Sequence, residues 1–307
     1  MAEQIPDPAH DADEGHGPPV PWIDPRMQQQ VGWRNGDIVI SVPVKSGTTW
    51  TMNIVHQLRS GGDPDMEDVY AEVPWLELLA GPTVEPDEVV RQIDAMPAEP
   101  RRAFKTHSGP GALPYHAPGS GVDVRYVVVM RHPDEVLASM YPFISRHSRE
   151  WFALWGIDKD EFVPPDFPAF VDGLGMDLVG GSVFSFAAAW WPLRNEPNVL
   201  MMHFSDMKRD HEGSVRQISD FLGFEPDPEQ WARVIEYTSF PWMKQHGEKF
   251  EIRTLTEVPI LESGAMVRKG RVGAAREDGV TEKMSARLAA MGQQIVGDEE
   301  ALAWIYR

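Results

Sequence analysis

Short runs of apolar, β-branched residues alternate along the chain with stretches that have the apolar spacing of helices. The apolar runs predict strands at 37–41, 103–106, 125–130 and 199–204. The run at 125–130 is apolar at nearly every position, which is typical of a strand covered on both faces. Helices are predicted at 49–58, from Pro133 onward, and at 183–193, 206–222, 227–237 and 281–305. This alternation indicates an α/β fold, with a mainly parallel central sheet flanked by helices on both faces.

The segments between these elements are predicted to be less regular. Residues 61–100 hold six prolines between short apolar patches, which favours short helices and loops. Residues 151–181 combine aromatic residues with prolines and predict a mobile segment, and residues 253–280 predict irregular structure. Residues 1–24 are rich in Pro, Gly, Asp and His, which predicts a disordered or extended arm before a single domain at 25–307.

The composition restricts the class of protein. The 307 residues are enough for one large α/β domain. The absence of cysteine excludes disulfides and thiolate metal sites, and it fits a cytoplasmic location. No apolar run approaches the roughly 18 residues of a spanning helix, so no stable membrane insertion is predicted. The N-terminus also lacks the apolar core of a secretory signal.

The charge balance bears on possible partners. The formal net charge is −19, so nucleic acid is not expected as a partner, because binding it requires a basic surface. An acidic protein that binds an anion must gather positive charge locally. The candidates for such a patch are Lys45, Arg131, Arg268 and Lys269.

The segment 43–50 reads Pro-Val-Lys-Ser-Gly-Thr-Thr-Trp and joins the first strand to a helix. The free N–H groups of a helix N-terminus and the charge of Lys45 favour a bound anion such as a phosphate. The loop is P-loop-like, but Lys45 precedes Gly47, whereas in the nucleotide P-loop the lysine directly follows the second glycine. A solvated turn without a ligand is the alternative interpretation.

Two further strands are followed by residues that could take part in catalysis or bind an anion. His107 follows the strand at 103–106, and Arg131 follows the strand at 125–130, where a P-loop enzyme would have an aspartate for magnesium. A cation in that place favours transfer without a metal. Because ligands of such sheets lie beyond the carboxyl ends of the strands, Lys45, His107 and Arg131 are expected along one crevice.

The residues at these positions have alternative, purely structural interpretations. Lys105 and His107 share a strand face, and an imidazole can accept a proton near neutral pH. His107 could instead be a structural histidine bonded to a loop carbonyl. Arg131 could form an ion pair with Asp134 or Glu135 at the start of the following helix.

Taken together, these motifs resemble those of the cytosolic-type sulfotransferases, and the chain is identified as a bacterial member of that family. The resemblance covers most of residues 35–275. It implies 3′-phosphoadenosine 5′-phosphosulfate (PAPS) as the donor and 3′-phosphoadenosine 5′-phosphate (PAP) as the product. The family's 5′-phosphosulfate loop matches 44–50, and its catalytic histidine lies in a Lys-Thr-His segment that matches 105–107. The resemblance therefore implies catalytic roles for His107, Lys45 and Lys105. In the loop it implies donor contacts from Lys45, Ser46, Gly47, Thr48, Thr49 and Trp50.

The remaining matches concern the 3′-phosphate and the adenine. The resemblance implies that Arg131, Ser139, Arg268, Lys269 and Gly270 bind the 3′-phosphate, and that Trp50, Thr238 and Phe240 contact the adenine. The chain departs from the family at Ala274 and Ala275, where Asp and Trp are usual, so closure of this loop is left open. The family's dimer signature is not recognisable, so the oligomeric state is also left open.

The resulting hypothesis is transfer of a sulfuryl group from PAPS to a hydroxyl or amine of a small, hydrophobic acceptor, such as an alcohol, phenol or lipid. His107 is the expected general base, and no metal is expected. Two alternatives remain from the residues alone, an ATP-dependent small-molecule or nucleotide kinase and a nucleotide-binding protein without catalysis. Aromatic residues that could line the acceptor pocket are Trp75, Tyr141, Phe143, Trp151, Trp155 and Trp242.

Overall fold

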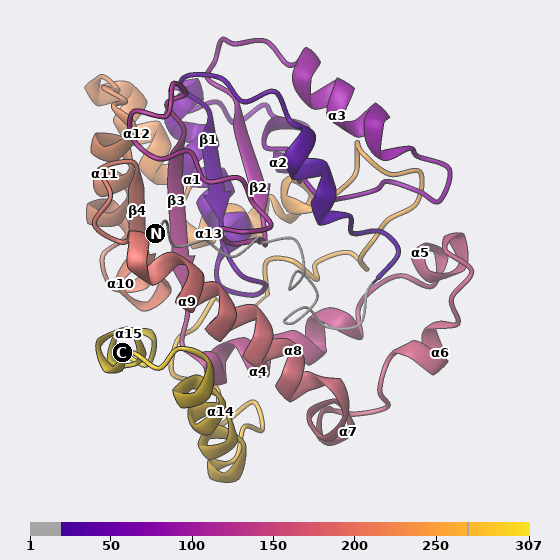
Figure 1. Cartoon of the computed structure of the whole chain (residues 1–307). Helices are drawn as coiled ribbons and strands as arrows, with labels where there is room; N and C mark the ends of the chain where they lie inside the picture. Colours follow the sequence, from indigo (N-terminus) through magenta and orange to yellow (C-terminus); the bar gives the residue numbers. More distant parts are fainter. Residues whose placement is uncertain (1–19, 269) are drawn as a thin grey trace, which may run out of the picture.

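The centre of the molecule is a four-stranded, all-parallel sheet (Figure 1). The computed structural model describes residues 20–268 and 270–307. The strands are β1 (Ile38–Ser41), β2 (Ala103–Thr106), β3 (Arg125–Met130) and β4 (Val199–His203), in the order β2-β1-β3-β4. Ile38 of β1 lies opposite Ala103 of β2 and Arg125 of β3. The predicted fold class is confirmed.

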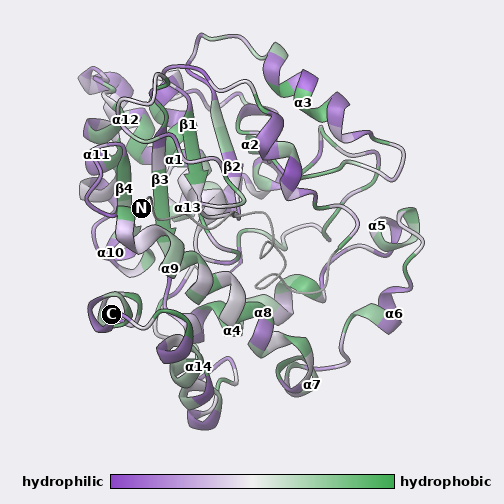
Figure 2. Cartoon of the chain, viewed as in Figure 1, coloured by the Kyte–Doolittle hydropathy of each residue, from purple (hydrophilic) through white to green (hydrophobic). Residues whose placement is uncertain are grey.

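Both faces of the sheet are buried, which explains the nearly continuous apolar runs of the strands. Ile38 and Ile40 belong to one core cluster, which also contains residues of α1 (Thr48–Ser60). Val39, between them, belongs to the opposite cluster, with residues of α4 (Pro133–Ile144). Successive side chains of a strand point to opposite faces, so the sheet lies between two hydrophobic cores. Figure 2 shows the strands in the green of hydrophobic residues.

The other helices surround this sheet. They are α2 (Val69–Glu72), α3 (Pro86–Ala95), α5 (Arg149–Leu154), α6 (Lys159–Phe162), α7 (Phe167–Phe170), α8 (Met176–Gly180), α9 (Phe186–Trp190), α10 (Phe204–Arg209), α11 (His211–Leu222), α12 (Pro228–Tyr237), α13 (Phe240–Gln245), α14 (Glu282–Ile295) and α15 (Glu299–Ile305).

Two predicted helices are each divided into two. The helix expected at 206–222 is α10 and α11, because Asp210 leaves the helical conformation and its carboxylate accepts the N–H of Gly213. The N-caps of α10 and α11 are His203 and Asp210. The helix expected at 281–305 is α14 and α15, separated at Gly297, which has a positive φ of 65°.

The segment 151–181, which was predicted to be mobile, is largely helical. It contains α5, α6 and a helical run, Phe167–Leu193, whose α8 contacts α4 and α14. Within the described residues this 27-residue run is the one segment long and apolar enough to cross a membrane by composition, which the sequence analysis did not anticipate. Half of its apolar window is buried inside the molecule, as in a core helix, so it is weak evidence for a membrane segment.

The predicted N-terminal arm lies largely outside the described residues. Its last part is described, and Trp22 in it is 6% exposed. The indole contacts the rings of Trp151, Phe152 and Phe162. The chain also forms a backbone hydrogen bond from Asp24 to Glu77. Residues that are distant in sequence thus meet beside the carboxyl ends of the strands.

Candidate active site

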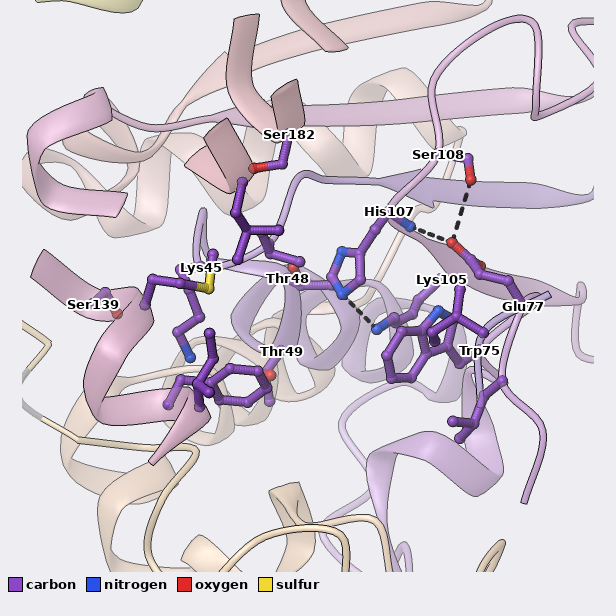
Figure 3. A pocket seen from close by; sticks show the side chains of 18 of the residues that line it. Lys45, Thr48, Thr49, Trp75, Glu77, Lys105, His107, Ser108, Ser139 and Ser182 are labelled. Carbon is purple, nitrogen blue, oxygen red and sulfur yellow. Dashed lines mark hydrogen bonds between the residues drawn. The ribbon is translucent and has the colours of Figure 1, made fainter. Parts of the chain in front are cut away.

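A cavity of about 1820 Å³ opens at the carboxyl ends of the strands. Lys45 follows β1, His107 follows β2 and Arg131 follows β3, and all three line this cavity. The expected shared crevice is therefore present. Figure 3 shows Lys45, Thr48 and Ser139 on one side of the cavity, and His107, Lys105 and Glu77 on the other.

The loop before α1 has the backbone of an anion site. Lys45 has a positive φ of 61°, and Gly47, the N-cap of α1, has a φ of 103°. The N–H groups of the first helical turn have no intrahelical partner and point out of the helix end. Thr48 Oγ1 is buried and lacks a hydrogen-bond partner among the described residues. Thr48, Thr49 and Gly47 all line the cavity, so both donors and space are available there.

Lys45 is held in an environment that disfavours its charge. Its Nζ lies 4.0 Å from the centroid of the Phe143 ring. Burial lowers the pKa of Lys45 to about 7, and the positive charges of Arg131 and Arg268 contribute to this shift. An anion that enters the cavity would stabilise the ammonium form, because an opposite charge at short range favours the charged state.

His107 is oriented by a backbone carbonyl. Its Nδ1–H donates to the Val42 carbonyl oxygen at 2.7 Å, which leaves the lone pair on Nε2. Lys105 Nζ lies 2.9 Å from that Nε2. Burial and the neighbouring Lys105 hold the pKa of His107 well below its usual range, so the imidazole is neutral at neutral pH. A neutral imidazole with its lone pair on Nε2 is the form that accepts a proton, once the acceptor hydroxyl takes the place of Lys105 at that nitrogen.

Two residues beside Lys105 and His107 come from the loop after α2. Lys105 Nζ lies 3.0 Å from the centroid of the Trp75 ring, a cation–π contact. Glu77 accepts hydrogen bonds from Thr106 Oγ1 and from the His107 N–H, each at 2.7 Å. The sequence analysis missed Glu77. A carboxylate between Leu76 and Leu78, within an apolar stretch, was the signal that could have identified it.

Arg131 both lines the cavity and forms the ion pair considered as its structural role. Its Nη2 lies 2.9 Å from Glu135 Oε2, and its side chain is 14% exposed. Its Nη1 donates to the Lys45 carbonyl, which connects two strand ends. Arg131 Nε is buried and lacks a partner within the described part of the chain, so the guanidinium retains donor capacity. Ser139, two turns along α4, lines the same cavity.

The basic loop reaches this side of the cavity as well. Arg268 and Gly270 line it, whereas Lys269 lies outside the described residues. Ala274 and Ala275, which replace the family's usual Asp and Trp, are buried, and the Ala275 N–H donates to Glu135 Oε1. The loop is thus tied to α4 through the carboxylate that also pairs with Arg131.

Two predicted donor-binding residues do not line the cavity. Ser46 is buried, and its N–H donates to the Pro43 carbonyl. Thr238, the C-cap of α12, is buried, and its Oγ1 donates to the Val234 carbonyl of that helix. The Trp50 indole donates to the Thr238 carbonyl, so Thr238 positions Trp50 through its backbone. Trp50 and Phe240 do line the cavity.

Only part of the predicted aromatic pocket is present. Trp75 and Phe143 line the cavity, whereas Tyr141, Trp151, Trp155 and Trp242 do not appear among its described lining residues. The sequence analysis missed other apolar and aromatic lining residues, namely Trp22, Leu78, Phe152, Phe162, Leu174, Leu178, Ile260 and Leu261. They come from segments that are far apart in the sequence, so no local pattern brings them together. Among residues 20–268 and 270–307, no group of three or more His, Asp or Glu side chains could hold a metal ion.

Comparison with known proteins agrees with this geometry. The family model for the sulfotransferase domain matches residues 35–299. Sulfotransferase 2A1 of Rattus norvegicus is 26% identical over 247 residues, covering 78% of each chain. Sulfotransferase 1E1 of Homo sapiens is 29% identical over 252 residues, covering 78% of this chain and 77% of the human protein.

Solved structures show the same fold. Mouse sulfotransferase SULT7A1 in complex with PAP superposes with a TM-score of 0.67 at 22% identity, covering 91% of each chain. Retinol dehydratase in complex with retinol and PAP superposes with a TM-score of 0.66 at 21% identity, covering 88% of this chain and 83% of the other.

Proposed function

The chain belongs to the sulfotransferase family, and we propose that it transfers the sulfuryl group of PAPS to a hydroxyl or amine of a small hydrophobic acceptor, with His107 as the general base. The family assignment replaces the kinase and the non-catalytic binding protein considered from the residues alone. The bacterial source and the cytoplasmic location stay predictions. The observation that carries the proposal is the shared cavity in which a neutral imidazole faces a group of buried cations.

The lining residues fit a donor with two phosphate positions. The N-terminus of α1, with Thr48 and Lys45, suits the 5′-phosphosulfate, since unpaired N–H groups and a cation meet there. Arg131, with its unpartnered Nε, suits the 3′-phosphate together with Ser139 and Arg268. Two rings, Trp50 and Phe240, also line the cavity and suit the adenine.

In the proposed reaction, the acceptor oxygen forms a bond to sulfur while the bond from sulfur to the bridging phosphate oxygen breaks. PAPS supplies the sulfuryl group and leaves as PAP. His107 takes the acceptor proton at Nε2, while its Nδ1–H stays bonded to Val42 and holds the ring in place. Lys45 and the N–H groups of α1 stabilise the charge that develops on the leaving phosphate, a contribution of about 10²–10³ in rate for a single donor in comparable sites. We expect no metal requirement.

The apolar end of the cavity supports a hydrophobic acceptor. It is lined by side chains such as Leu78, Phe152, Phe162 and Ile260. Two structures of the related retinol dehydratase contain retinol or androsterone, both hydrophobic alcohols. A burial coefficient of roughly 25 cal/mol per Å² means that an apolar acceptor gains most of its affinity from such a surface. An alcohol or phenol with an extended apolar body is therefore the proposed class.

The function is tested with sulfur-labelled PAPS and a metabolite and lipid extract, read by mass shift. Wild-type protein should form sulfated products, with EDTA and without. His107→Ala should reduce turnover by roughly 10²–10⁴-fold because the general base is lost. PAP affinity, measured by calorimetry, should change little.

A matched control is His116→Ala, at a histidine outside the lining of the cavity, which should retain turnover. Near-normal turnover by His107→Ala would remove His107 from its proposed role. Strict dependence on a metal ion would contradict the metal-free reaction.

A further inference from the structure

Glu77 is a buried carboxylate that the reaction described above does not use. It is 2% exposed and lies in the loop after α2. Its Oε1 accepts from Thr106 Oγ1 and the His107 N–H at 2.7 Å, and from Ser108 Oγ at 3.5 Å. Its Oε2 is buried and has no hydrogen-bond partner in the part of the chain that the structure describes. Figure 3 shows the dashed lines that join the Glu77 carboxylate to the His107 N–H and to Ser108.

The hydrogen bonds alone do not require a carboxylate. The amide oxygen of a glutamine could accept the same bonds from Thr106 and His107. A neutral amide already lies nearby, since Gln28 Oε1 is 2.8 Å from Thr106 Oγ1 as a second acceptor for its one proton, and the Gln28 nitrogen donates to Ser108. Burying a carboxylate with an unpaired oxygen is costly unless its charge is used. The feature that glutamate adds at this position is therefore its negative charge.

The ammonium group of Lys105 is the group that the negative charge of Glu77 can stabilise. The ammonium lies against the Trp75 ring and 2.9 Å from His107 Nε2, and Lys105 is 2% exposed. Other charged or titratable groups around the pair are Lys45 across the cavity, the Tyr70 ring at 5.9 Å from Lys105 Nζ, and the neighbouring Asp24–Arg26 ion pair. Lys45 opposes the charge of Lys105, and Asp24 is neutralised by Arg26, which leaves Glu77 as the counter-charge.

We propose that Glu77 is a positioning residue, whose carboxylate fixes the backbone of His107 and keeps Lys105 an ammonium in the closed cavity. Lys105 donates to His107 Nε2 in this structure, and as an ammonium it exchanges that bond for one to a negative oxygen of the sulfuryl group, which opens Nε2 to the acceptor proton. This inference rests on the proposed sulfuryl transfer.

Burial shifts the pKa values of Lys105 and Glu77 toward their neutral forms, and the interaction between the two groups opposes both shifts. Burial holds the pKa of Lys105 well below its usual value, and Lys45 lowers it further, whereas Glu77 raises it. Burial also raises the pKa of Glu77, and Lys105, the Thr106 hydroxyl and the His107 N–H act against this rise. Each member of the pair thus stabilises the charged form of the other.

The first test measures charge without depending on turnover. In protein labelled with ¹³C at the lysine Cε, the Lys105 signal is assigned by its loss in Lys105→Arg and is followed against pH. In Glu77→Gln, Lys105 should lose its proton at a pH at least one unit lower than in wild type. An unchanged titration overturns the inference. If Glu77→Gln does not fold, the ¹³Cδ signal of Glu77 in wild-type protein decides, since a protonated carboxyl group at pH 7 overturns the inference too.

The second test separates catalysis from binding. With an acceptor found in the labelled-donor screen, Glu77→Gln should lower kcat roughly tenfold or more and leave the Kd of PAP within about twofold. Wild-type kcat in this variant would overturn the inference. If wild-type protein forms no sulfated product, the proposed function fails, and the NMR titration still decides the role of Glu77.

A matched control is Glu72→Gln, on α2. Glu72 forms an ion pair with Arg59 and is absent from the described lining of the cavity. This substitution should lower stability, because it leaves the buried Arg59 unpaired, and should leave the Lys105 titration and kcat unchanged. A loss of kcat in Glu72→Gln as large as in Glu77→Gln would show that lost stability explains both.

Discussion

Lys45 has a backbone conformation and a side-chain environment that suit the binding of an anion. Its positive φ turns the chain away from β1, and its pKa is lowered to about 7 by burial. Because PAP binds the ammonium form, the free protein must take up a proton on binding above this pH. The affinity for PAP should therefore not be limited by the protonation of Lys45 below pH 7. It should fall roughly tenfold per pH unit above it, until the pKa of Lys45 in the complex is reached.

Calorimetry at pH 8.5, in two buffers of different ionisation enthalpy, measures this proton uptake. The phosphate groups have finished ionising by then, since their second pKa lies near ~6. Lys45→Arg keeps the charge but does not titrate in this range, so most of the uptake should disappear in this variant. PAP binding by the wild-type protein without net proton uptake would show that Lys45 is already charged in the free protein.

The residues at the strand ends were predictable, and those that surround them were not. A buried strand followed directly by Arg131 or His107 places these residues at a known edge of the sheet. Glu77 and Trp22 belong to segments without periodicity and reach the cavity only through tertiary packing. For Ser46 and Thr238, the motif gave the position in the chain but not the direction of the side chain, which depends on local hydrogen bonds.

At the scale of the elements, the turn between β1 and α1 depends on Gly47. Its φ is 103°, and a Cβ at this position would lie 2.7 Å from Phe204 Cδ2. The Phe204 ring is also 4.7 Å from the Arg131 guanidinium, so a displaced ring disturbs the phosphate side of the cavity. Gly47→Ala should cost about 1–3 kcal/mol of stability and lower PAP affinity at least roughly tenfold.

Gly223→Ala is the matched control for this substitution. Gly223 ends α11 with a positive φ of 74°, and none of the described atoms lies within 4 Å of the position of an added Cβ. The backbone strain is thus similar, without the clash. Urea unfolding should show a loss of about 1–2 kcal/mol in the control, and titration should show unchanged PAP affinity. Equal affinity losses in both variants would mean that the Phe204 contact is irrelevant to the site.

Some helices and strands were predicted correctly from the sequence and others were not, and local interactions explain the difference. The strand at 125–130 matches the structure, because a strand buried on both faces leaves a nearly continuous apolar run. The strand at 103–106 also matches, although Lys105 and Thr106 are polar. The helix at 206–222 divides because the Asp210 side chain competes for a backbone N–H, which an amphipathic pattern does not reveal. The run Phe167–Leu193 is helical despite its prolines and glycines, since packing on α4 and α14 overrides their low propensity.

At the scale of the whole molecule, the overall charge and the local charge have opposite signs. The chain carries 47 acidic and 28 basic residues, a net charge of −19. Lys45, Lys105, Arg131 and Arg268 nevertheless converge on one cavity. The segments that bring these cations together are distant in sequence. The net charge could be read directly from the sequence, and a local patch with Lys45, Arg131 and Arg268 was expected from the motifs, whereas the cavity that these residues share is a product of the tertiary structure.

This opposition predicts an unusual dependence of PAP binding on salt. A polyanion approaching the protein first meets the long-range repulsion of the net charge, which acts over about 30 Å at 0.01 M salt and about 10 Å at 0.1 M. The attraction of the cavity acts at short range and is screened much less. The association rate constant, measured by stopped-flow fluorescence of the tryptophans, should therefore rise as salt increases from 0.01 to 0.1 M, while the dissociation rate constant changes less. A fall in the association rate over this range would mean that the field of the cavity already dominates outside the protein, where it would steer the donor inward despite the acidic surface.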